Sequence, residues 1–599
     1  MLYEPATTIH FSNTLSKAIG KHSLKLGGQA YHYSIDNYQP NDVVGNFQFS
    51  GSATGNAFSD FLFGVMNKGS VQVQPVFVSS RAWSYALFLQ DDFKLTPKLT
   101  LNAGLRWQYD QSFRELHDGN AFFNPYSGTW EQFGVNAPDT TLDPSKKQFE
   151  PRVGLSWNPV GGLVVRAGYG IMHPGYVGHG RAGDGQPGPN LLRGTSLGAG
   201  TQWDSPLLVD IPPADPRAPI PVNSFVSFSS WAPRKQYPTY TQLWNLTVQK
   251  QLDRDTTAQL GYVGTKGTHL PINYAYNICQ QSPASLAANG WGATTSPYCS
   301  DAAALSAGIW NLVVTPGWWG LSSSIYHSMQ AQFDHRFSHN FSLLANFTWS
   351  KLIDDSSSDW GGFWSLDVLG QNFYDRKSER SVSAGDIPFR LTLAPVVELP
   401  FGPGKQWLNS GAAGYLLGGW RASAIYTISA GTPFGIIDNA YGYCNGGHML
   451  SDRPMLMGNP ASVSGSQRRV NLWFNNQALD FSGTCPGPGL VNVTGPSDIN
   501  KAFGNSPRYF SNVRNPGVNN FDFSLQKDFK IPTGEKTRIT FSADLFNLPN
   551  HPQFAEPVGD PTMGYFPAAN GNRAAGFGAI SGTSFYANRI VQLGLHLYF

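Results

Sequence analysis

Apolar and polar residues alternate along much of this 599-residue chain with a period of two. That is the period of a β-strand whose two faces meet different surroundings. The pattern is clear near the C-terminus, where Leu593, Leu595 and Leu597 alternate with Gly594 and His596. It predicts an all-β protein with fifteen strands, near residues 7–16, 23–33, 82–94, 99–112, 148–158, 163–173, 240–252, 256–269, 324–337, 341–352, 386–400, 416–430, 519–530, 536–547 and 587–599.

Short turns and long loops follow one another between these strands. Fourteen strands form seven hairpins, most of which close through a few turn-forming residues such as Thr96-Pro97-Lys98, Ser338-His339-Asn340 and Pro532-Thr533-Gly534. The hairpin around 401–415 is looser. Between hairpins the connections span roughly 34–81, 113–147, 174–239, 270–323, 353–385, 431–518 and 548–586. Such long loops are uncommon in compact soluble domains. Short turns at one end and long loops at the other predict a transmembrane antiparallel β-barrel of the outer membrane.

Four polar residues interrupt the apolar strand faces, and all four lie close to a short turn. Each is followed two positions later by an apolar residue; the pairs are Asp91 and Phe93, Lys250 and Leu252, His335 and Phe337, and Lys527 and Phe529. A lipid-facing Lys or Arg costs about 2–4 kcal/mol at mid-bilayer but about 0–1 kcal/mol near the interface. The shared depth therefore favours a membrane over a soluble sandwich. It predicts one aromatic belt here and a second at Trp107, Tyr109, Trp349 and Tyr426.

Composition agrees with this architecture and excludes others. Aromatic residues make up 14% of the chain and charged residues 13%, with 65 Gly and 42 Pro, which rules out helical bundles and coiled coils. A propeller would repeat every 40–50 residues or so, whereas these hairpins are unevenly spaced. A net charge of +2 without a basic stripe gives no case for nucleic acid. No run of about 18 apolar residues predicts a transmembrane helix, and residues 1–30 lack a signal-peptide pattern.

The number of strands carries an expectation about the start of the chain. If the short turns are periplasmic, the first and last strands both run inward. Fifteen is odd, whereas bacterial single-chain barrels have even strand numbers. We therefore expect this chain to lack its N-terminal portion, signal peptide included. The alternative is one unrecognised strand, for which 69–78 is the best place. Pairing of the first strand with the last in a closed barrel would contradict the first hypothesis.

Several motifs occur in order along the chain. They are GNAFSDFLFG at 55–64, FEPRVG at 149–154, VGTKGTHL at 263–270, SIYHSMQ at 324–330, RFSH at 336–339, ANFTWSKLIDD at 345–355 and LFNLPNH at 545–551. Each motif alone is weak, but their order along most of the chain makes the match fairly specific. Together they resemble the Oar-like group of TonB-dependent receptors.

The resemblance implies a 22-stranded barrel with an N-terminal plug, a periplasmic energy-coupling box and often a carboxypeptidase-regulatory-like sandwich. Residues 1–599 would then be a partial barrel domain of about 15–16 strands, without signal peptide, sandwich or plug. The C-terminus fits the assembly signal of outer-membrane proteins at Gln592, Gly594, Leu597 and Phe599. The implied partners are outer-membrane lipid, the barrel-assembly machinery and an unknown extracellular ligand. A periplasmic energy-coupling protein is implied only if the missing N-terminal part is present.

The four cysteines fall two to a loop. Cys279 with Cys299, and Cys444 with Cys485, are candidates for two intra-loop disulfides, because exposed loops in an oxidising compartment favour them. The alternative is four free thiols.

Metal and phosphate sites have plainer alternatives. Asp354, Asp355 and Asp359 stand among serines and suggest calcium ligands, but their spacing misses the EF-hand loop and favours a solvated polar loop. His173 and His179 lack a third ligand at metal spacing. The segment GKHS at 20–23 is expected in a periplasmic turn, since no helix follows it. No metal or cofactor is predicted.

The long loops are the expected place of function. Loops rich in Trp, Tyr, Asn and Gly suit bulky ligands, although their rings could instead pack the loops together. The candidate aromatics are Trp291, Trp310, Trp318, Trp319, Trp360 and Trp364. No catalytic constellation stands out, so an enzyme is not predicted. The first hypothesis is an outer-membrane receptor that takes up a large ligand. The alternatives are an adhesion or surface-organising barrel without transport, and a secreted soluble β-rich carbohydrate-binding protein.

Overall fold

The structure is a computed structural model, and its description covers most of the strands and part of the long loops. The described residues are 5–38, 46–72, 77–116, 121–124, 129–132, 134–138, 143–174, 194–197, 201–202, 228–231, 237–272, 313–316, 319–357, 376–402, 404–436, 453–463, 468–480, 505–530, 537–559, 576–580, 582–584 and 588–599.

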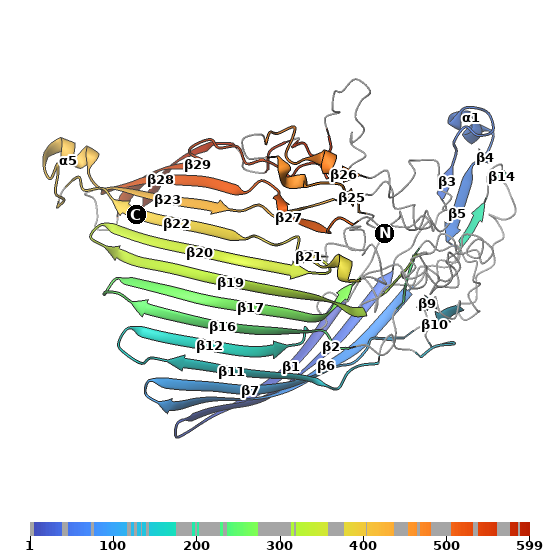
Figure 1. Ribbon diagram of the computed structural model, residues 1–599, viewed down its shortest axis with the longest axis horizontal. Helices are drawn as coiled ribbons and strands as arrows, with labels where there is room; N and C mark the ends of the chain where they lie inside the picture. Colours follow the sequence, from blue (N-terminus) through green and yellow to red (C-terminus); the bar gives the residue numbers. More distant parts are fainter. Residues whose placement is uncertain are drawn as a thin grey trace.

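One large antiparallel sheet dominates the molecule, and its long strands follow one another in chain order (Figure 1). All fifteen predicted strands are confirmed. They are β1 (Ala6–Ile19), β2 (His22–Tyr38), β6 (Phe77–Thr96), β7 (Leu99–Asp110), β11 (Gln148–Trp157), β12 (Leu163–Met172), β16 (Tyr240–Gln251), β17 (Thr256–Ile272), β19 (Trp319–Ser338), β20 (Phe341–Asp354), β22 (Phe389–Glu398), β23 (Trp420–Ser429), β28 (Val518–Lys530), β29 (Arg538–Phe546) and β30 (Ile590–Tyr598). Two short strands, β8 (Arg114–Glu115) and β21 (Ser381–Val382), pair at the rim of the same sheet.

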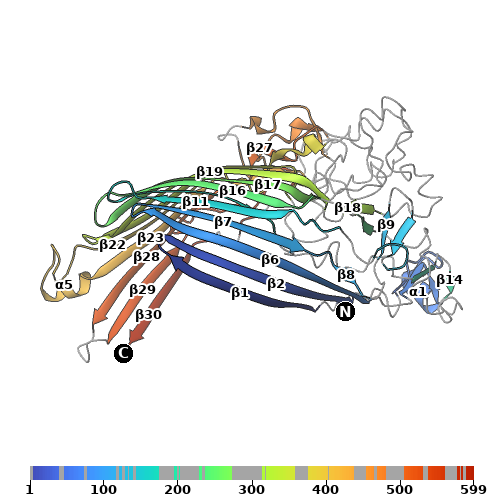
Figure 2. The same ribbon diagram turned by 90° about the horizontal axis from the view of Figure 1, so that it is seen from below.

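The sheet curls into an incomplete barrel with β1 and β30 at its two edges (Figure 2). Within the described residues β1 pairs with β2, β30 pairs with β29, and the two edge strands do not pair with each other. Both edge strands run in the same direction, so a direct pairing would be parallel, unlike the antiparallel pairs that build this sheet. The expected N-terminal portion therefore stays a prediction.

Residues 69–78 do not supply a sixteenth barrel strand, which corrects the alternative drawn from the sequence. The strand β5 (Lys68–Gln72) pairs with β3 (Asn46–Gln48) and β13 (Gly194–Leu197) in a separate small sheet. Phe77 and Val78 belong to the start of β6. The local alternation is real, but its partners come from loops rather than from the barrel.

The two ends of the sheet differ as expected, and we call them the turn end and the loop end. At the turn end, β19 and β20 are joined through His339 and Asn340, which both have positive φ, at 49° and 65°. Two such residues in succession fit a type I′ hairpin turn, whose twist matches that of the flanking strands. The predicted turn at Pro532-Thr533-Gly534 lies outside the described residues.

Small elements gather at the loop end, while one short helix lies at the turn end. The helix at the turn end is α5 (Gly411–Leu417). The loops contain β4 (Val65–Met66), β9 (Ala121–Asn124), β10 (Thr129–Gln132), β14 (Thr201–Gln202), β15 (Phe228–Trp231), β18 (Val313–Pro316), β24 (Pro433–Gly435), β25 (Met455–Leu456), β26 (Leu479–Asp480) and β27 (Tyr509–Arg514), with α1 (Ala57–Leu62) and the 3-10 helices η4 (Arg376–Glu379), η5 (Pro460–Ser462) and η6 (Asn476–Ala478). Among the described residues, no helix has the length and apolar character needed to cross a membrane.

The two faces of the sheet have opposite character. Leu105, Leu260 and Leu595 share one face and are 49%, 54% and 71% exposed, so no protein covers them. Arg106 and Glu150 lie side by side on the other face, in paired positions of β7 and β11. A continuous exposed apolar face opposite a polar one is the alternation of a membrane barrel.

The four polar residues predicted to interrupt the apolar face near the short turns are all hydrogen-bonded. His22 Nδ1 lies 2.6 Å from a carboxylate oxygen of Asp91, and Lys250 Nζ donates to Gly161 O at 3.3 Å. His335 Nδ1 lies 2.8 Å from the hydroxyl of Thr256. These partners belong to turns and neighbouring strands, so the groups need not face hydrocarbon alone. The hydrogen-bond acceptors of Lys527 are instead backbone carbonyls of the helix α5.

Candidate functional site

A small hydrophobic core holds parts of two long loops together at the loop end, and we call it the loop core. It joins residues of the predicted loops 431–518 and 548–586, which are separate in the sequence. Strand β27 contributes two of its side chains and pairs with β24. The rings of Phe434 and Phe577 both contact Phe474, at centroid distances of 4.7 and 5.4 Å. The members of the loop core are Phe434, Ile436, Phe474, Leu479, Phe510, Val513 and Phe577.

Three ion pairs attach this region to the strand ends, and we call them the arginine clasp. They join Arg508 to Asp354, Arg514 to Asp386 and Arg453 to Glu379. The three carboxylates lie at the end of β20, between β21 and β22, and in η4. Arg508 directly precedes β27 and Arg514 is its last residue, while Phe510 and Val513 of the same strand enter the loop core. The clasp therefore connects the folded part of the loops to the barrel wall.

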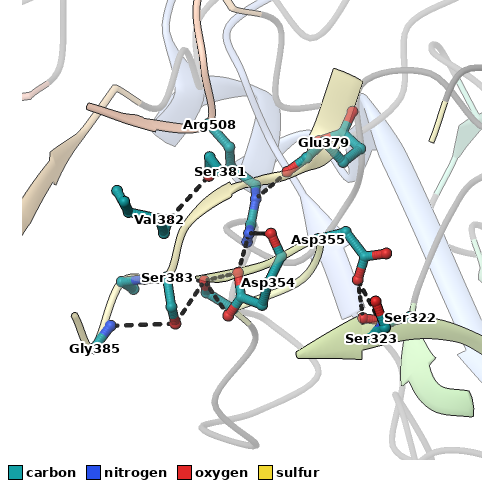
Figure 3. Close-up of polar contacts among 12 residues, drawn as sticks. Ser322, Ser323, Asp354, Asp355, Glu379, Ser381, Val382, Ser383, Gly385 and Arg508 are labelled. Carbon is teal, nitrogen blue, oxygen red and sulfur yellow. Dashed lines mark hydrogen bonds and ion pairs between the residues drawn. The ribbon is translucent and has the colours of Figure 1, made fainter. Parts of the chain in front are cut away.

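Each arginine of the clasp also binds backbone carbonyls. The Arg508 guanidinium donates to Glu379 O and Asp354 O, both at 3.2 Å (Figure 3). Arg514 donates to Asp386 Oδ2 at 2.6 Å and to Gly431 O at 3.2 Å. A planar guanidinium with five donors suits such multiple contacts. Buried charges that are paired and hydrogen-bonded in this way fix one geometry, because losing a partner is costly.

Two of the acidic residues considered as calcium ligands, Asp354 and Asp355, take part in protein contacts. Asp354 is 4% exposed and is paired with Arg508, and it also accepts a hydrogen bond from Ser357 at 3.0 Å. Asp355 accepts the backbone N–H of Ser323 at 2.7 Å (Figure 3). The expected solvated loop is therefore wrong for Asp354, because an arginine and a hydroxyl group replace the water around it. Asp355 stays partly exposed. Asp359 lies outside the described residues.

A second polar cluster lies on the inner wall of the sheet. Glu150, 2% exposed, lies 3.3 Å from Arg152 Nη2 and 3.7 Å from Arg106 Nε, and it accepts the backbone N–H of His173 at 2.8 Å. The FEPRVG motif thus places Glu150 and Arg152 on the polar face. A hollow of 440 Å³ opens there. It is lined in part by Gln29, Gln90, Asn102, Arg106, Glu150 and Arg152.

The GNAFSDFLFG motif forms a capped helix with an apolar tip. Asn56 accepts the backbone N–H groups of Phe58 and Ser59, which caps α1. The Thr54 hydroxyl and backbone N–H both donate to Asp60, and these bonds hold the pKa of that carboxyl below its usual range. The tip leaves four side chains 47–73% exposed, namely Phe58, Phe61, Leu62 and Phe63.

Several predicted site residues cannot be placed. The following residues, or their side chains, lie outside the part of the chain that the structure describes: Cys279, Cys299, Cys444, Cys485, His179, Trp291, Trp310, Trp318, Trp319, Trp360 and Trp364. Only the backbone of Trp319 is described, at the start of β19. The C-terminal residues Gln592, Gly594 and Leu597 lie in β30, and Phe599 follows it with 97% of its surface exposed.

The clasp was missed by sequence reasoning, although one signal was present. Charged residues are rare in this chain, yet residues 375–380 carry five in six positions. Such a concentration in a loop indicates ion pairing with distant partners. Within the described residues, no three His, Cys, Asp or Glu side chains gather to form a metal site.

Comparison with known proteins supplies the context for this geometry. A family model described as "Outer membrane beta barrel domain" matches residues 2–592. The fold resembles the outer membrane transporter YddB from Escherichia coli, with a TM-score of 0.51 and 10% identity, over 100% of this chain and 55% of that one. BauA, the ferric preacinetobactin receptor from Acinetobacter baumannii, is similar at TM-score 0.42 and 11% identity, over 100% and 54%. This chain thus spans about half the length of these two proteins. A search of curated proteins found no match.

Proposed function

The chain belongs to the outer membrane beta barrel domain family, and on that premise we propose that it is the barrel of a TonB-dependent receptor that binds and takes up a large extracellular ligand. Its place is the cell outer membrane, so the secreted soluble alternative is set aside. We also propose that the receptor is of the Oar-like type and that residues 1–599 form a partial barrel domain. The proposal also includes energy coupling through a plug and coupling box.

The clasped loop region is the observation that carries this proposal. A barrel that only anchors a protein needs no folded structure above its opening. Loops that only surround the opening and remain in water need no buried charges. Here Glu379 and Asp386 are 1% and 0% exposed, each paired with an arginine from a distant loop. Preorganised loops hold a binding surface without ordering cost at the moment of binding. A rigid surface at the loop end of a barrel suits capture of a bulky ligand.

The polar inner face of the sheet supports passage of a ligand through the barrel, and not only binding at its surface loops. Its hollow combines the charged groups of Arg106 and Glu150 and the amide of Gln29 with apolar surface that includes Phe88. A polar, hydrogen-bonding lumen is expected where a plug or a hydrophilic solute must lie against the wall. The predicted disulfides Cys279–Cys299 and Cys444–Cys485 belong to the same proposal, because they would further stiffen the loops.

Energy-coupled uptake can be tested with the complete gene in its own cells. Wild-type and deletion strains are grown in medium containing a defined mixture of oligopeptides and oligosaccharides, and depletion of each compound is followed by mass spectrometry. We expect gene-dependent depletion of at least one compound, abolished by a protonophore, because coupled transport needs the proton gradient of the inner membrane.

The same measurement distinguishes the adhesion alternative. Gene-dependent binding that persists unchanged with the protonophore, without accumulation inside the cell, would favour an adhesion or surface-organising barrel. A further strain, which produces the Asp386→Ala variant, tests the part played by the clasp. If the clasped region forms the binding surface, this strain should retain the barrel in the membrane but lose depletion.

A further inference from the structure

The hairpin between β22 and β23 differs from the other described turns at its end of the sheet. The others are short and polar, such as Pro97 with Lys98 and His339 with Asn340. This one joins Glu398 to Trp420, is described at 399–402 and 404–419, and contains α5. Five of its large apolar side chains are 43–60% exposed, namely Trp407, Leu408, Tyr415, Leu416 and Leu417. A rim exposed to water alone would not be expected to expose so many apolar groups together.

The hairpin is held in a fixed place. Lys405 Nζ donates to Glu398 Oε2 at 2.9 Å and also to Asn340, so the hairpin is tied to the adjacent β19–β20 turn. The two ends of the hairpin pack closely at Gly402 and Gly418. A Cβ at Gly418 would lie 2.2 Å from the Gly402 Cα, so no larger residue fits there without a shift of the backbone. The exposed apolar side chains therefore belong to an ordered element.

Lys527 joins α5 to the apolar face of the sheet. This residue interrupts that face on β28, yet it is only 4% exposed. Its ammonium donates to Tyr415 O at 2.5 Å and to Leu416 O at 2.8 Å. These carbonyls belong to the last turn of α5, where carbonyl groups lack helical partners and the helix dipole is negative. The helix end thus stabilises the charge of the Lys527 ammonium, which would otherwise face outward from the sheet.

Aromatic rings also surround the Lys527 ammonium. Lys527 Nζ lies 4.8 Å from the ring of Phe529 and 5.6 Å from that of Trp420. Trp420 also donates its indole N–H to Leu416 O at 3.3 Å and contacts the ring of Phe541. The apolar surface therefore continues without a break from β23, β28 and β29 onto α5.

We propose that the 399–419 hairpin is an interfacial anchor whose apolar side chains insert into the periplasmic leaflet of the outer membrane, between phospholipid headgroups and acyl chains. Three observations carry this assignment. The helix lies at the turn end, and its apolar surface is continuous with the lipid-facing surface of the barrel. The one charged side chain of the hairpin, Lys405, is already paired. Interfacial helices bury their apolar face about 5–10 Å into this boundary. The inference rests on membership of the outer-membrane family and not on the proposed uptake.

Fluorescent labels at Leu416 and Leu417 test the anchor. The full chain, with its four cysteines changed to serine and either Leu416→Cys or Leu417→Cys added, is folded into vesicles of phosphatidylethanolamine and phosphatidylglycerol. An environment-sensitive thiol dye is attached, and quenching by acyl-chain nitroxide phospholipid is compared with quenching by aqueous iodide. Arg254→Cys, in the β16–β17 turn, is the matched control, and heat-modifiable migration verifies folding of each variant.

We expect lipid nitroxide to quench the labels at 416 and 417 about threefold more strongly than the label at 254, with iodide showing the opposite order. Equal iodide access at all three positions would contradict the anchor. A blue-shifted label that neither quencher reaches would also overturn it, since that result indicates a protein partner on this surface. Leu417→Glu should reduce lipid quenching at 416 while the barrel stays folded.

Discussion

Replacing Asp386 by alanine is expected to detach the loop core from the barrel wall, with a loss of local stability of about 3–5 kcal/mol. Asp386 is fully buried and accepts hydrogen bonds from Arg514 and from the backbone N–H of Leu352, each at 2.6 Å. Without the carboxylate, the Arg514 guanidinium keeps only carbonyl partners in a site where its side chain is 17% exposed. Removing one member of a buried pair leaves a buried charge uncompensated, and this is the source of the loss.

The same carboxylate offers a matched control. Lys351 Nζ also lies near Asp386, at 3.4 Å, but its side chain is 44% exposed. Exposed pairs contribute about 0–1 kcal/mol, so Lys351→Ala should change little. Hydrogen exchange of residues 505–516, measured by mass spectrometry on protein in lipid nanodiscs, reports both variants. Equal protection of this segment in the wild type and in Asp386→Ala would show that the clasp does not hold the loop core.

Replacing Leu260 by arginine is expected to destabilise the folded barrel by about 2–4 kcal/mol. Leu260 lies on the apolar face of β17, four residues beyond the strand's first residue at the turn end, and is 54% exposed. Its cross-strand neighbour on β16 is Val248. An arginine at this depth must leave water for hydrocarbon or distort the bilayer around it. The free energy of unfolding in lipid vesicles, from denaturant titration, measures the loss.

Gln259 supplies the control one residue away. It lies on the opposite, polar face, paired with Gln249 and Gln332. Gln259→Arg should therefore cost much less than Leu260→Arg, although the two substitutions add the same charge to the same strand. A larger loss of unfolding free energy for Gln259→Arg than for Leu260→Arg would show that the face of Gln259 meets the lipid. That result would reverse the assignment of the inner and outer faces of the sheet.

The strands could be predicted from the sequence because each face meets one kind of surroundings along its whole length. Within the membrane, hydrocarbon enforces the alternation, so the sequence predicts the fifteen strands and the short turns that the structure describes. Boundaries were less accurate at the loop end, where β6 begins at Phe77 instead of 82 and β19 at Trp319 instead of 324. There the strands continue beyond the membrane, and no lipid requires an apolar residue at every second position.

The clasp could not be predicted, since its partners are remote in the sequence. Arg514 and Asp386 are separated by 128 positions, and Arg508 and Asp354 by 154. Nothing local distinguishes a carboxylate that will be buried by a distant arginine from one that stays in water. For this reason the sequence alone predicts a solvated loop for Asp354.

The turn-end helix shows a different limit of sequence reasoning. The sequence predicted a strand from residue 416, whereas Leu416 and Leu417 end α5 and β23 begins at Trp420. Continuous apolar residues fit a buried strand and an interfacial helix equally well. The position of Lys527 near the turn was predicted, but its hydrogen bonds to α5 carbonyls depend on a fold in three dimensions that alternation does not encode.

Nitroxide labels placed one at a time at residues 259–263 of β17 test the central claim, that one face of this sheet meets lipid and the other does not. Accessibility to oxygen, which concentrates in hydrocarbon, is compared with accessibility to a water-soluble nickel chelate for protein in bilayers. The fold predicts oxygen maxima at Leu260 and Tyr262 and minima at Gln259, Gly261 and Val263, a period of two in phase with the register against β16. A profile without that period, or one with maxima at 259, 261 and 263, would contradict the account.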